Sequence, residues 1–301
     1  EIEIPDSVTT IYSSAFINCA KLTKAVLSSG LKEISSSLFK YDDQLKEVVI
    51  PEGIQSVNSD AFRECNGLTE MTLPDSITYM DGYVFRNCEN LTSVKLPKNL
   101  ESIGSETFYG CKKLEEVVWP ETIKTIGENA FAFCSLSGLK LPETLEKIGS
   151  YAFLETSVKE VTIPDGITEI GTSAFQECDK LIQVKTGKGL STIGGYAFAN
   201  CHNLERVYIA PGTVEIGSSA FYWCEKVNKI YLPSSVKTIR DFAFSGGREK
   251  VSCNVYYAGS ETDKEAITIE TANQLLTTDG WTHWYYDQTE IPSGIISGII
   301  L

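Results

Sequence analysis

The chain has 301 residues, 42% of them hydrophobic, and its 40 acidic and 26 basic side chains leave a net charge of −14. This acidic excess argues against nucleic acid as a partner, because binding phosphates needs a basic face, and it disfavours an anionic membrane surface. No apolar run reaches the roughly 18 residues that cross a bilayer, so the sequence predicts no membrane-spanning segment.

A phenylalanine recurs at a nearly constant interval along most of the chain. The successive spacings are 23 residues five times, 22 twice and 23 three times. The residues are Phe16, Phe39, Phe62, Phe85, Phe108, Phe131, Phe153, Phe175, Phe198, Phe221 and Phe244. A fixed period of this length is typical of solenoids, in which stacked repeats bury one another's apolar faces. The sequence therefore predicts about 11 repeats of 22–23 residues.

The first residues, Glu1 to Pro5, match the end of a later repeat, Val161 to Pro164. The chain thus begins inside a predicted strand, without the polar cap that solenoids use at their ends. No basic segment followed by an apolar one opens it, so no signal peptide is recognisable here. We expect the sequence to be part of a longer protein, with any targeting segment upstream.

Each repeat begins with a strand. Val94 and Leu96 alternate with Ser93 and Lys95, which is the period of a half-buried strand. Pro97 ends this strand, since proline has no N–H group for the ladder. A second extended segment is expected to turn its own apolar residues, Leu100 and Ile103, into the interior.

In six of the repeats an Ile-Gly pair precedes the phenylalanine, whereas Tyr12 and Arg240 stand in the glycine position of two others. Glycine at this point, as at Gly104, indicates a tight bend or a positive φ. The Ser-x-Ala/Thr-Phe segment that follows is expected to form one helical turn. Eleven buried phenylalanines would contribute on the order of 15–30 kcal/mol before chain entropy is subtracted.

The residues after Phe244 depart from the repeat. We predict a last strand at Val255 to Tyr257, an acidic helix-compatible piece from Glu261 to Glu265, and an aromatic strand from His283 to Tyr286. The repeats would then span 1–257 and a C-terminal cap 258–290, with Trp281 and Trp284 covering the end of the core. Residues 291–301 form an apolar tail that we leave unassigned.

The full repeat pattern, [LI]-P-x-x-[VIL]-x-x-I-G-x-x-A-F-x-x-C-x-x-L-x-x-V-x-[LI], resembles the BspA-like leucine-rich repeat, also called the Treponema pallidum type. The similarity covers residues 1 to about 257. It implies a leucine-rich-repeat solenoid of the α/β horseshoe type, with mostly short parallel strands and short helical turns. It further implies a cell-surface or secreted protein, commonly of host-associated microbes, whose better-known relatives are adhesins. The family offers no catalytic residues to carry over.

Eight of the nine cysteines stand three residues after the repeat phenylalanine. They are Cys19, Cys65, Cys88, Cys111, Cys134, Cys178, Cys201 and Cys224, while Asp42 and Thr156 fill the same position in two other repeats. We expect a ladder of buried free thiols that behave as small apolar residues. An occasional disulfide between neighbouring rungs stays open, because their separation of about 5 Å is within bridging distance.

Catalytic and metal sites receive little support. There is no C-x-x-C motif, and His202 and His283 are the only histidines, so a zinc site is disfavoured. Cys201 and His202 are sequence neighbours whose side chains diverge, which argues against a nucleophile–base pair. We predict no enzyme, no cofactor and no metal.

The outward strand positions carry the functional prediction. The residue between the two buried strand residues reads Val26, Val49, Thr72, Lys95, Val118, Lys140, Thr162, Lys185, Tyr208, Tyr231 and Tyr256 along the repeats. Arg206 and Lys229 stand beside the first two tyrosines, and tyrosine and arginine are common in binding hot spots. An equally simple reading is that tyrosine is a good strand former on an exposed face.

We therefore predict a non-enzymatic surface or secreted protein that recognises a host or microbial protein or glycan through its strand face. The predicted partner-binding residues are Arg206, Tyr208, Lys229, Tyr231 and Tyr256. The alternative is a structural stalk or spacer of the cell envelope, with specificity in segments outside this sequence.

Overall fold

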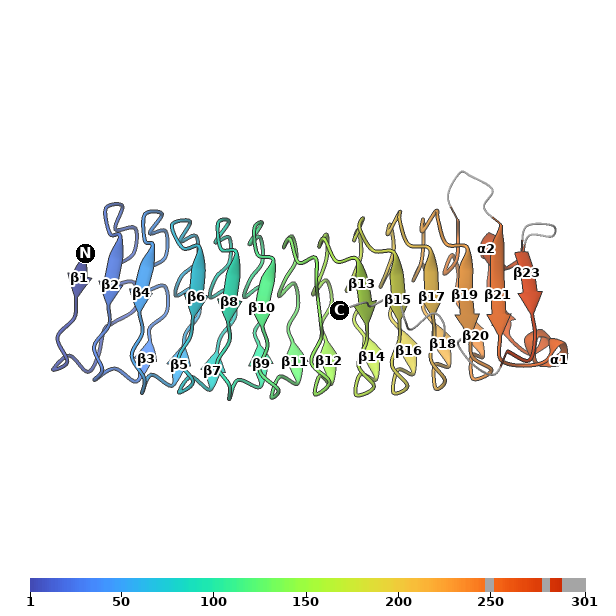
Figure 1. Cartoon of the computed structure of the whole chain (residues 1–301), viewed down its shortest axis with the longest axis horizontal. Coiled ribbons are helices and arrows are strands. Elements are labelled where there is room, and N and C mark those ends of the chain that lie inside the picture. The colour runs from blue at the N-terminus through green and yellow to red at the C-terminus, as the bar shows by residue number, and fades with distance from the viewer. Residues whose placement is uncertain (247–251, 278–281, 289–301) are drawn as a thin grey trace. The chain divides into compact units, whose positions relative to one another are not determined.

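The computed structural model describes residues 1–246, 252–277 and 282–288. Within it the chain folds as two compact units, residues 1–158 and residues from 159 onward. Trp281 and residues 291–301, on which part of the predicted cap and the whole predicted tail depend, lie outside the described residues. In both units the chain winds as a solenoid of short strands with little helix, so the predicted fold class is confirmed (Figure 1).

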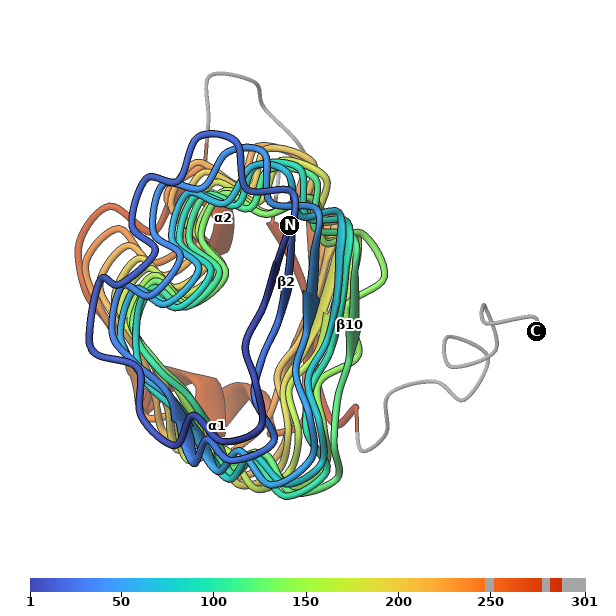
Figure 2. The same cartoon turned by 90° about the vertical axis from the view of Figure 1, so that its left-hand side faces the viewer.

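Unit 1 has two rows of parallel strands. The first strands of its rungs are β1 (Ile2–Glu3), β2 (Lys24–Val26), β4 (Glu47–Val49), β6 (Glu70–Thr72), β8 (Ser93–Lys95) and β10 (Glu116–Val118). They pair as two sheets, in the orders β1-β2-β4 and β6-β8-β10. The second extended segments are β3 (Glu33–Ile34), β5 (Ser56–Val57), β7 (Tyr79–Met80), β9 (Ser102–Ile103), β11 (Thr125–Ile126) and β12 (Lys147–Ile148). Seen end-on in Figure 2, the rungs of unit 1 lie behind one another around a common interior.

Unit 2 repeats this plan and adds the two described helices. Its first strands pair in the order β13 (Glu160–Thr162), β15 (Gln183–Lys185), β17 (Arg206–Tyr208), β19 (Lys229–Leu232), β21 (Cys253–Tyr257) and β23 (Thr282–Tyr285). Its second row is β14 (Glu169–Ile170), β16 (Thr192–Ile193), β18 (Glu215–Ile216), β20 (Thr238–Ile239) and β22 (Thr268–Ile269). The helices are α1 (Glu261–Glu265), which Ser260 caps, and α2 (Gln274–Thr277). The strands and the acidic helix predicted after Phe244 are confirmed in the described residues.

The core follows the repeat. Every phenylalanine of the series from Phe39 to Phe244 is fully buried. Within unit 1 the rings stack at 5.1–5.7 Å between centroids, from Phe16–Phe39 to Phe131–Phe153. Within unit 2, Phe175, Phe198, Phe221 and Phe244 stack at 5.0–5.3 Å. Stacked parallel rings exclude water from both faces, so each rung depends on its neighbours for its core.

The segment around each phenylalanine differs from the predicted helical turn. It consists of tight turns, and from Phe16 to Phe221 a left-handed residue lies two positions before the ring and another two positions after it, such as Asp60 and Glu64 around Phe62. Its backbone also pairs with the next rung, as when Phe62 N–H donates to the Val84 carbonyl at 2.9 Å. A helix would turn these N–H and C=O groups onto its own chain, so pairing between rungs favours the turns.

The glycine of the Ile-Gly pair also has a different role from the expected one. Gly104 and Gly127 have no positive φ; among the glycines that the structure describes, Gly53, Gly110 and Gly212 do. A Cβ atom on Gly127 would lie 2.7 Å from the Ser105 nitrogen and 2.8 Å from the Gly104 carbonyl carbon. Glycine is thus needed where the backbones of successive rungs approach closely, not to permit an unusual dihedral angle.

Candidate functional site: the tyrosine column

Parallel pairing brings the predicted tyrosines into one line on unit 2. Tyr208 of β17 is opposite Tyr231 of β19, and Tyr231 is opposite Tyr256 of β21. Val207, Ile230 and Val255, which precede them, are fully buried in the core, so alternation turns the tyrosines to the other face. The line continues to Tyr285 of β23, which is opposite Tyr256. We call Tyr208, Tyr231, Tyr256 and Tyr285 the tyrosine column.

The rings of the column stack face to face. Their centroids are 4.6 Å apart for Tyr208–Tyr231, 4.6 Å for Tyr231–Tyr256 and 5.1 Å for Tyr256–Tyr285, with interplanar angles of 20°, 11° and 15°. The spacing follows from the strand separation, which holds equivalent side chains about 4.8 Å apart. The rings therefore cover one another's faces.

Two members of the column are less exposed than an outward strand position suggests. Tyr208 is only 2% exposed and Tyr231 only 7%, whereas Tyr285 is 44% exposed. Val49 and Val118, at the same strand position in unit 1, are 41% and 46% exposed. A large ring stacked on its neighbour loses surface that a valine on the same face retains. The expectation that Tyr208 and Tyr231 lie open on the surface is therefore wrong.

Burial changes the chemistry of the two phenols. It raises the pKa of Tyr231 to about 12, and the neighbouring Tyr208 and Tyr256 act in the same direction. Burial also raises the pKa of Tyr208, although Arg206 opposes this. The Tyr208 hydroxyl is buried and has no hydrogen-bond partner among the described residues. Both phenols stay neutral at physiological pH and can act as hydrogen-bond donors.

Three basic residues of neighbouring strand positions lie beside the tyrosine column. Arg206 is opposite Lys229 in the paired strands, and Lys185 is opposite Tyr208. The Arg206 guanidinium donates from Nε to Gln183 Oε1 at 3.0 Å, and its Nη1 is 3.8 Å from Glu205 Oε2. The structure thus brings all five predicted residues together, with Arg206 partly neutralised by Glu205.

Tyr285 belongs to this site but was absent from the predicted set. Its strand was expected from the run His283 to Tyr286, yet Tyr285 follows Tyr256 by 29 residues, outside the repeat spacing. The run alternates Trp284 and Tyr286 with His283 and Tyr285, and this alternation was the available signal for Tyr285. Only the pairing of β23 with β21 identifies which aromatic residue continues the column.

The cysteines form the predicted ladder. Six of them are buried thiols whose Sγ donates to the carbonyl of the phenylalanine 26 residues earlier, at 3.0–3.2 Å: Cys65, Cys88, Cys111, Cys134, Cys201 and Cys224. Burial raises the pKa of Cys201 well above its ordinary value. A thiol that is buried, protonated and bonded to a carbonyl is not an activated nucleophile, so Cys201 and His202 do not form a catalytic pair.

The described ranges 1–246, 252–277 and 282–288 offer neither a metal-binding cluster nor a membrane-spanning helix. They contain no group of three or more metal-ligating His, Cys, Asp or Glu side chains. None of the helices in these ranges is long and apolar enough to cross a membrane.

The chain is similar to several proteins of known structure, two of which have TM-scores above 0.5. A leucine-rich repeat protein from Bacteroides ovatus ATCC 8483 is 23% identical, with a TM-score of 0.53 over 95% of this chain and 91% of that one. One from Eubacterium ventriosum ATCC 27560 is 19% identical, with a TM-score of 0.56 over 97% and 84%. A leucine-rich cell surface protein from Faecalibacterium prausnitzii A2-165 is 26% identical, with a TM-score of 0.48 over 87% and 86%.

Among curated proteins, none matches the chain in sequence. The model of the BspA-type leucine-rich repeat region does match, over residues 1–92, 32–157 and 146–256, which together take in most of the chain. The same residues supply the stacked phenylalanines, the thiol ladder and the paired strands described above. The chain belongs to the BspA-type leucine-rich repeat family.

Proposed function

We propose that this protein is a non-enzymatic binding protein of the cell surface or the secreted fraction, and that it recognises a protein or glycan partner through its strand face. The observation that carries the proposal is the tyrosine column with Arg206 and Lys229 along its side and Lys185 at its end. Family membership supports the surface location and the binding role. In this proposal residues 1–257 are the binding solenoid and residues 258–290 its C-terminal cap.

The stacking of the column favours a protein partner over a glycan. Sugars pack on the faces of aromatic rings, but here the faces of Tyr231 and Tyr256 are covered on both sides by neighbouring rings. Tyr285 is 44% exposed and has one face that no other member of the column covers. A glycan would therefore depend on Tyr285 alone, whereas a protein can contact ring edges, hydroxyl groups and the flanking cations together.

The partner can be sought with the labelled 301-residue chain on an array of matrix proteins, plasma proteins and glycans. For any partner found, replacing Tyr256 and Tyr285 by serine should weaken binding by at least about tenfold, as expected for central aromatic contacts. Arg206→Glu and Lys229→Glu should slow association and remove its dependence on salt.

The control is Val49→Ser, an exposed residue at the same strand position in unit 1. It should leave the dissociation constant unchanged. Circular dichroism should show that each tyrosine variant keeps its fold. If the folded Tyr256→Ser, Tyr285→Ser double variant binds as tightly as the parent chain, the tyrosine column is not the binding site.

A further inference from the structure

The row of first strands in unit 1 ends at β10, because the next rung forms no strand. The residues that should continue the row, 135–142, have no regular secondary structure. One residue separates Cys134 from Leu136, where two separate Cys111 from Leu114 in the rung before, so this turn is shorter by one residue. Gly138 also replaces a strand residue, and glycine weakens a strand.

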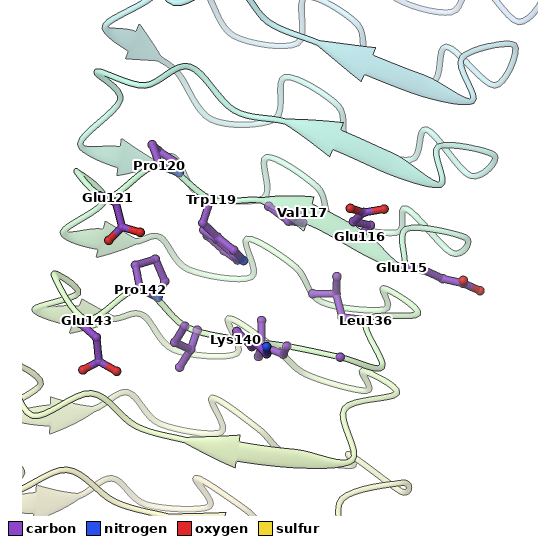
Figure 3. A pocket seen from close by; sticks show the side chains of 13 residues that line it. Glu115, Glu116, Val117, Trp119, Pro120, Glu121, Leu136, Lys140, Pro142 and Glu143 are labelled. Carbon is purple, nitrogen blue, oxygen red and sulfur yellow. The ribbon is translucent and has the colours of Figure 1, made fainter. Parts of the chain in front are cut away.

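The interruption leaves a cavity of about 400 Å³ between β10 and residues 136–143. Its apolar lining includes Val117, Trp119, Leu136, Leu139 and Leu141. Figure 3 shows the Trp119 ring directed from the end of β10 towards the neighbouring rung. Val117 and Trp119 are partly exposed here, although Val94 and Leu96, their counterparts one rung earlier, are 1% and 2% exposed.

The backbone of β10 is unpaired along this cavity. In the rung before, the Thr92 carbonyl accepts from Glu115 N–H at 2.9 Å, and Leu96 N–H donates to the Val118 carbonyl at 3.2 Å. The equivalent groups one rung later are the Glu115 carbonyl and Trp119 N–H. Within the part of the chain that the structure describes, neither has a backbone partner across the cavity. An extended chain laid along β10 would supply both partners.

The rim of the cavity is acidic. Glu115 and Glu116 lie at one end and Glu121 and Glu143 at the other, and all four are exposed (Figure 3). In the described residues none of these carboxylates forms an ion pair. Lys140 is the basic residue of the lining. Four carboxylates against one ammonium group attract a cationic ligand.

We propose that this groove binds an extended, cationic peptide segment of another protein, which adds to β10 as a parallel or antiparallel strand. Alternate side chains of such a segment point inwards and outwards. The inward ones are apolar and pack against Trp119 and Leu139, and the outward ones are lysine or arginine and lie beside Glu116. A second copy of this chain is a poor occupant because it carries a net charge of −14.

The test uses a fluorescein-labelled peptide of alternating lysine and valine and the 301-residue chain, with fluorescence anisotropy as the readout. Saturable binding is expected, and it should weaken strongly between about 0.05 and 0.5 M NaCl, as screening requires. A glutamate–valine peptide should not bind. A lysine–valine peptide with N-methylated backbone amides should also fail, because it cannot donate hydrogen bonds to a strand edge.

Three variants connect the binding to this groove. Glu115→Gln with Glu116→Gln should weaken binding on the order of tenfold, whereas Glu70→Gln, the equivalent outward position of β6, should not. Trp119→Leu introduces the residue found at this position in other rungs, such as Leu73 and Leu96, and should weaken binding while the fold is kept. Gly138→Val should favour a strand beside β10, which would occupy the groove and abolish binding. The fold should tolerate this substitution, because a Cβ atom at Gly138 meets nothing within 4 Å.

The proposal is overturned if the lysine–valine peptide shows no saturable binding. Equal binding of the N-methylated peptide, or equal binding to the Gly138→Val variant, overturns it too, because strand addition at β10 would then play no part. A concentration-dependent dimer that Gly138→Val abolishes would assign the groove to a second copy instead. The proposal does not rest on the tyrosine column, and Tyr256→Ser should leave peptide binding unchanged.

Discussion

Asp42 occupies a position that a cysteine fills in most rungs, and it is fully buried. One carboxylate oxygen accepts a hydrogen bond from Cys19 N–H, and the other has no partner among the described residues. Burial raises the pKa of Asp42 to about 6; the Cys19 N–H opposes this shift and Asp43 adds to it. The folded chain thus holds a proton that the unfolded chain releases near pH 3.8.

Because of this raised pKa, the free energy of unfolding should fall as the pH rises from about 4 to 6 and then level off. Asp42→Asn should increase the free energy of unfolding at pH 7 by about 1–2 kcal/mol. It should have little effect at pH 4, where both side chains are neutral in the folded chain. Urea unfolding at several pH values measures this. The control is Asp179→Asn, an exposed residue at the position that Asp43 has in its own rung. A destabilised Asp42→Asn protein at pH 7 would show that the carboxylate is well solvated.

A second prediction concerns the glycines at which the backbones of neighbouring rungs approach closely. Gly127→Ala places a methyl group within 3 Å of three backbone atoms, which cannot rotate away. It should cost about 1–3 kcal/mol of the free energy of unfolding, as overpacking commonly does. Gly138→Ala meets no atom within 4 Å and should stay within about 0.5 kcal/mol of the parent. Equal costs at both positions would point to a general effect of losing glycine.

Stacking of the rungs aligns equivalent residues into rows that run along the solenoid. The cysteine ladder is one such row, here called the thiol row, and the stacked phenylalanines form another. Burial and the bond to a phenylalanine carbonyl keep the thiol row protonated, and burial raises the pKa of Cys88 to about 12. Thiolate, the form that reacts with alkylating reagents, is therefore scarce in the folded chain. Both the thiol row and the phenylalanine row are therefore interpreted as parts of the core that stabilise the fold.

Iodoacetamide at pH 8 should therefore leave the buried cysteines of the folded chain unmodified. Cys19, which is partly exposed, should be the first to react. Denaturant should then release the remaining thiols, and mass spectrometry can count them. Rapid labelling of Cys88 or Cys111 in the folded chain would show that the thiol row opens to solvent. A denatured count well below nine cysteines would show bridges between rungs.

Across the whole molecule, charge is the dominant long-range feature. The net charge is −14 and the isoelectric point about 4.7. Exposed ion pairs between rungs, such as Lys124–Glu101 at 3.0 Å, contribute only about 0–1 kcal/mol each. Repulsion among the excess carboxylates should therefore outweigh what salt removes from these pairs.

Salt should accordingly stabilise the chain at neutral pH. At pH 7 the urea midpoint is expected to rise between about 0.01 and 0.3 M NaCl, because screening weakens the repulsion. Near pH 4.7, where the net charge vanishes, the same addition should have little effect. A similar rise at both pH values would indicate a general salting-out effect instead of relief of charge repulsion.

The sequence by itself determined the rung. The interval between phenylalanines, the alternation of Val94 and Leu96 with Ser93 and Lys95, and the position of the cysteines were enough to predict the stacked solenoid and its core. This succeeded because every inward residue meets copies of itself in the neighbouring rungs, so a local pattern also describes the long-range contacts. The alignment of Tyr208 with Tyr231 follows from the same period, and the strand predicted at Val255 to Tyr257 adds Tyr256.

Only the tertiary structure decided what depends on the particular neighbours of a residue. Burial of Tyr208 and Tyr231 requires rings that stack at 4.6 Å, and Tyr285 joins them only because β23 pairs with β21. The left-handed turns around each phenylalanine reflect hydrogen bonds between rungs that no local propensity specifies. The groove beside β10 exists because one rung does not pair, and a missing ladder is visible only when the two backbones are seen together.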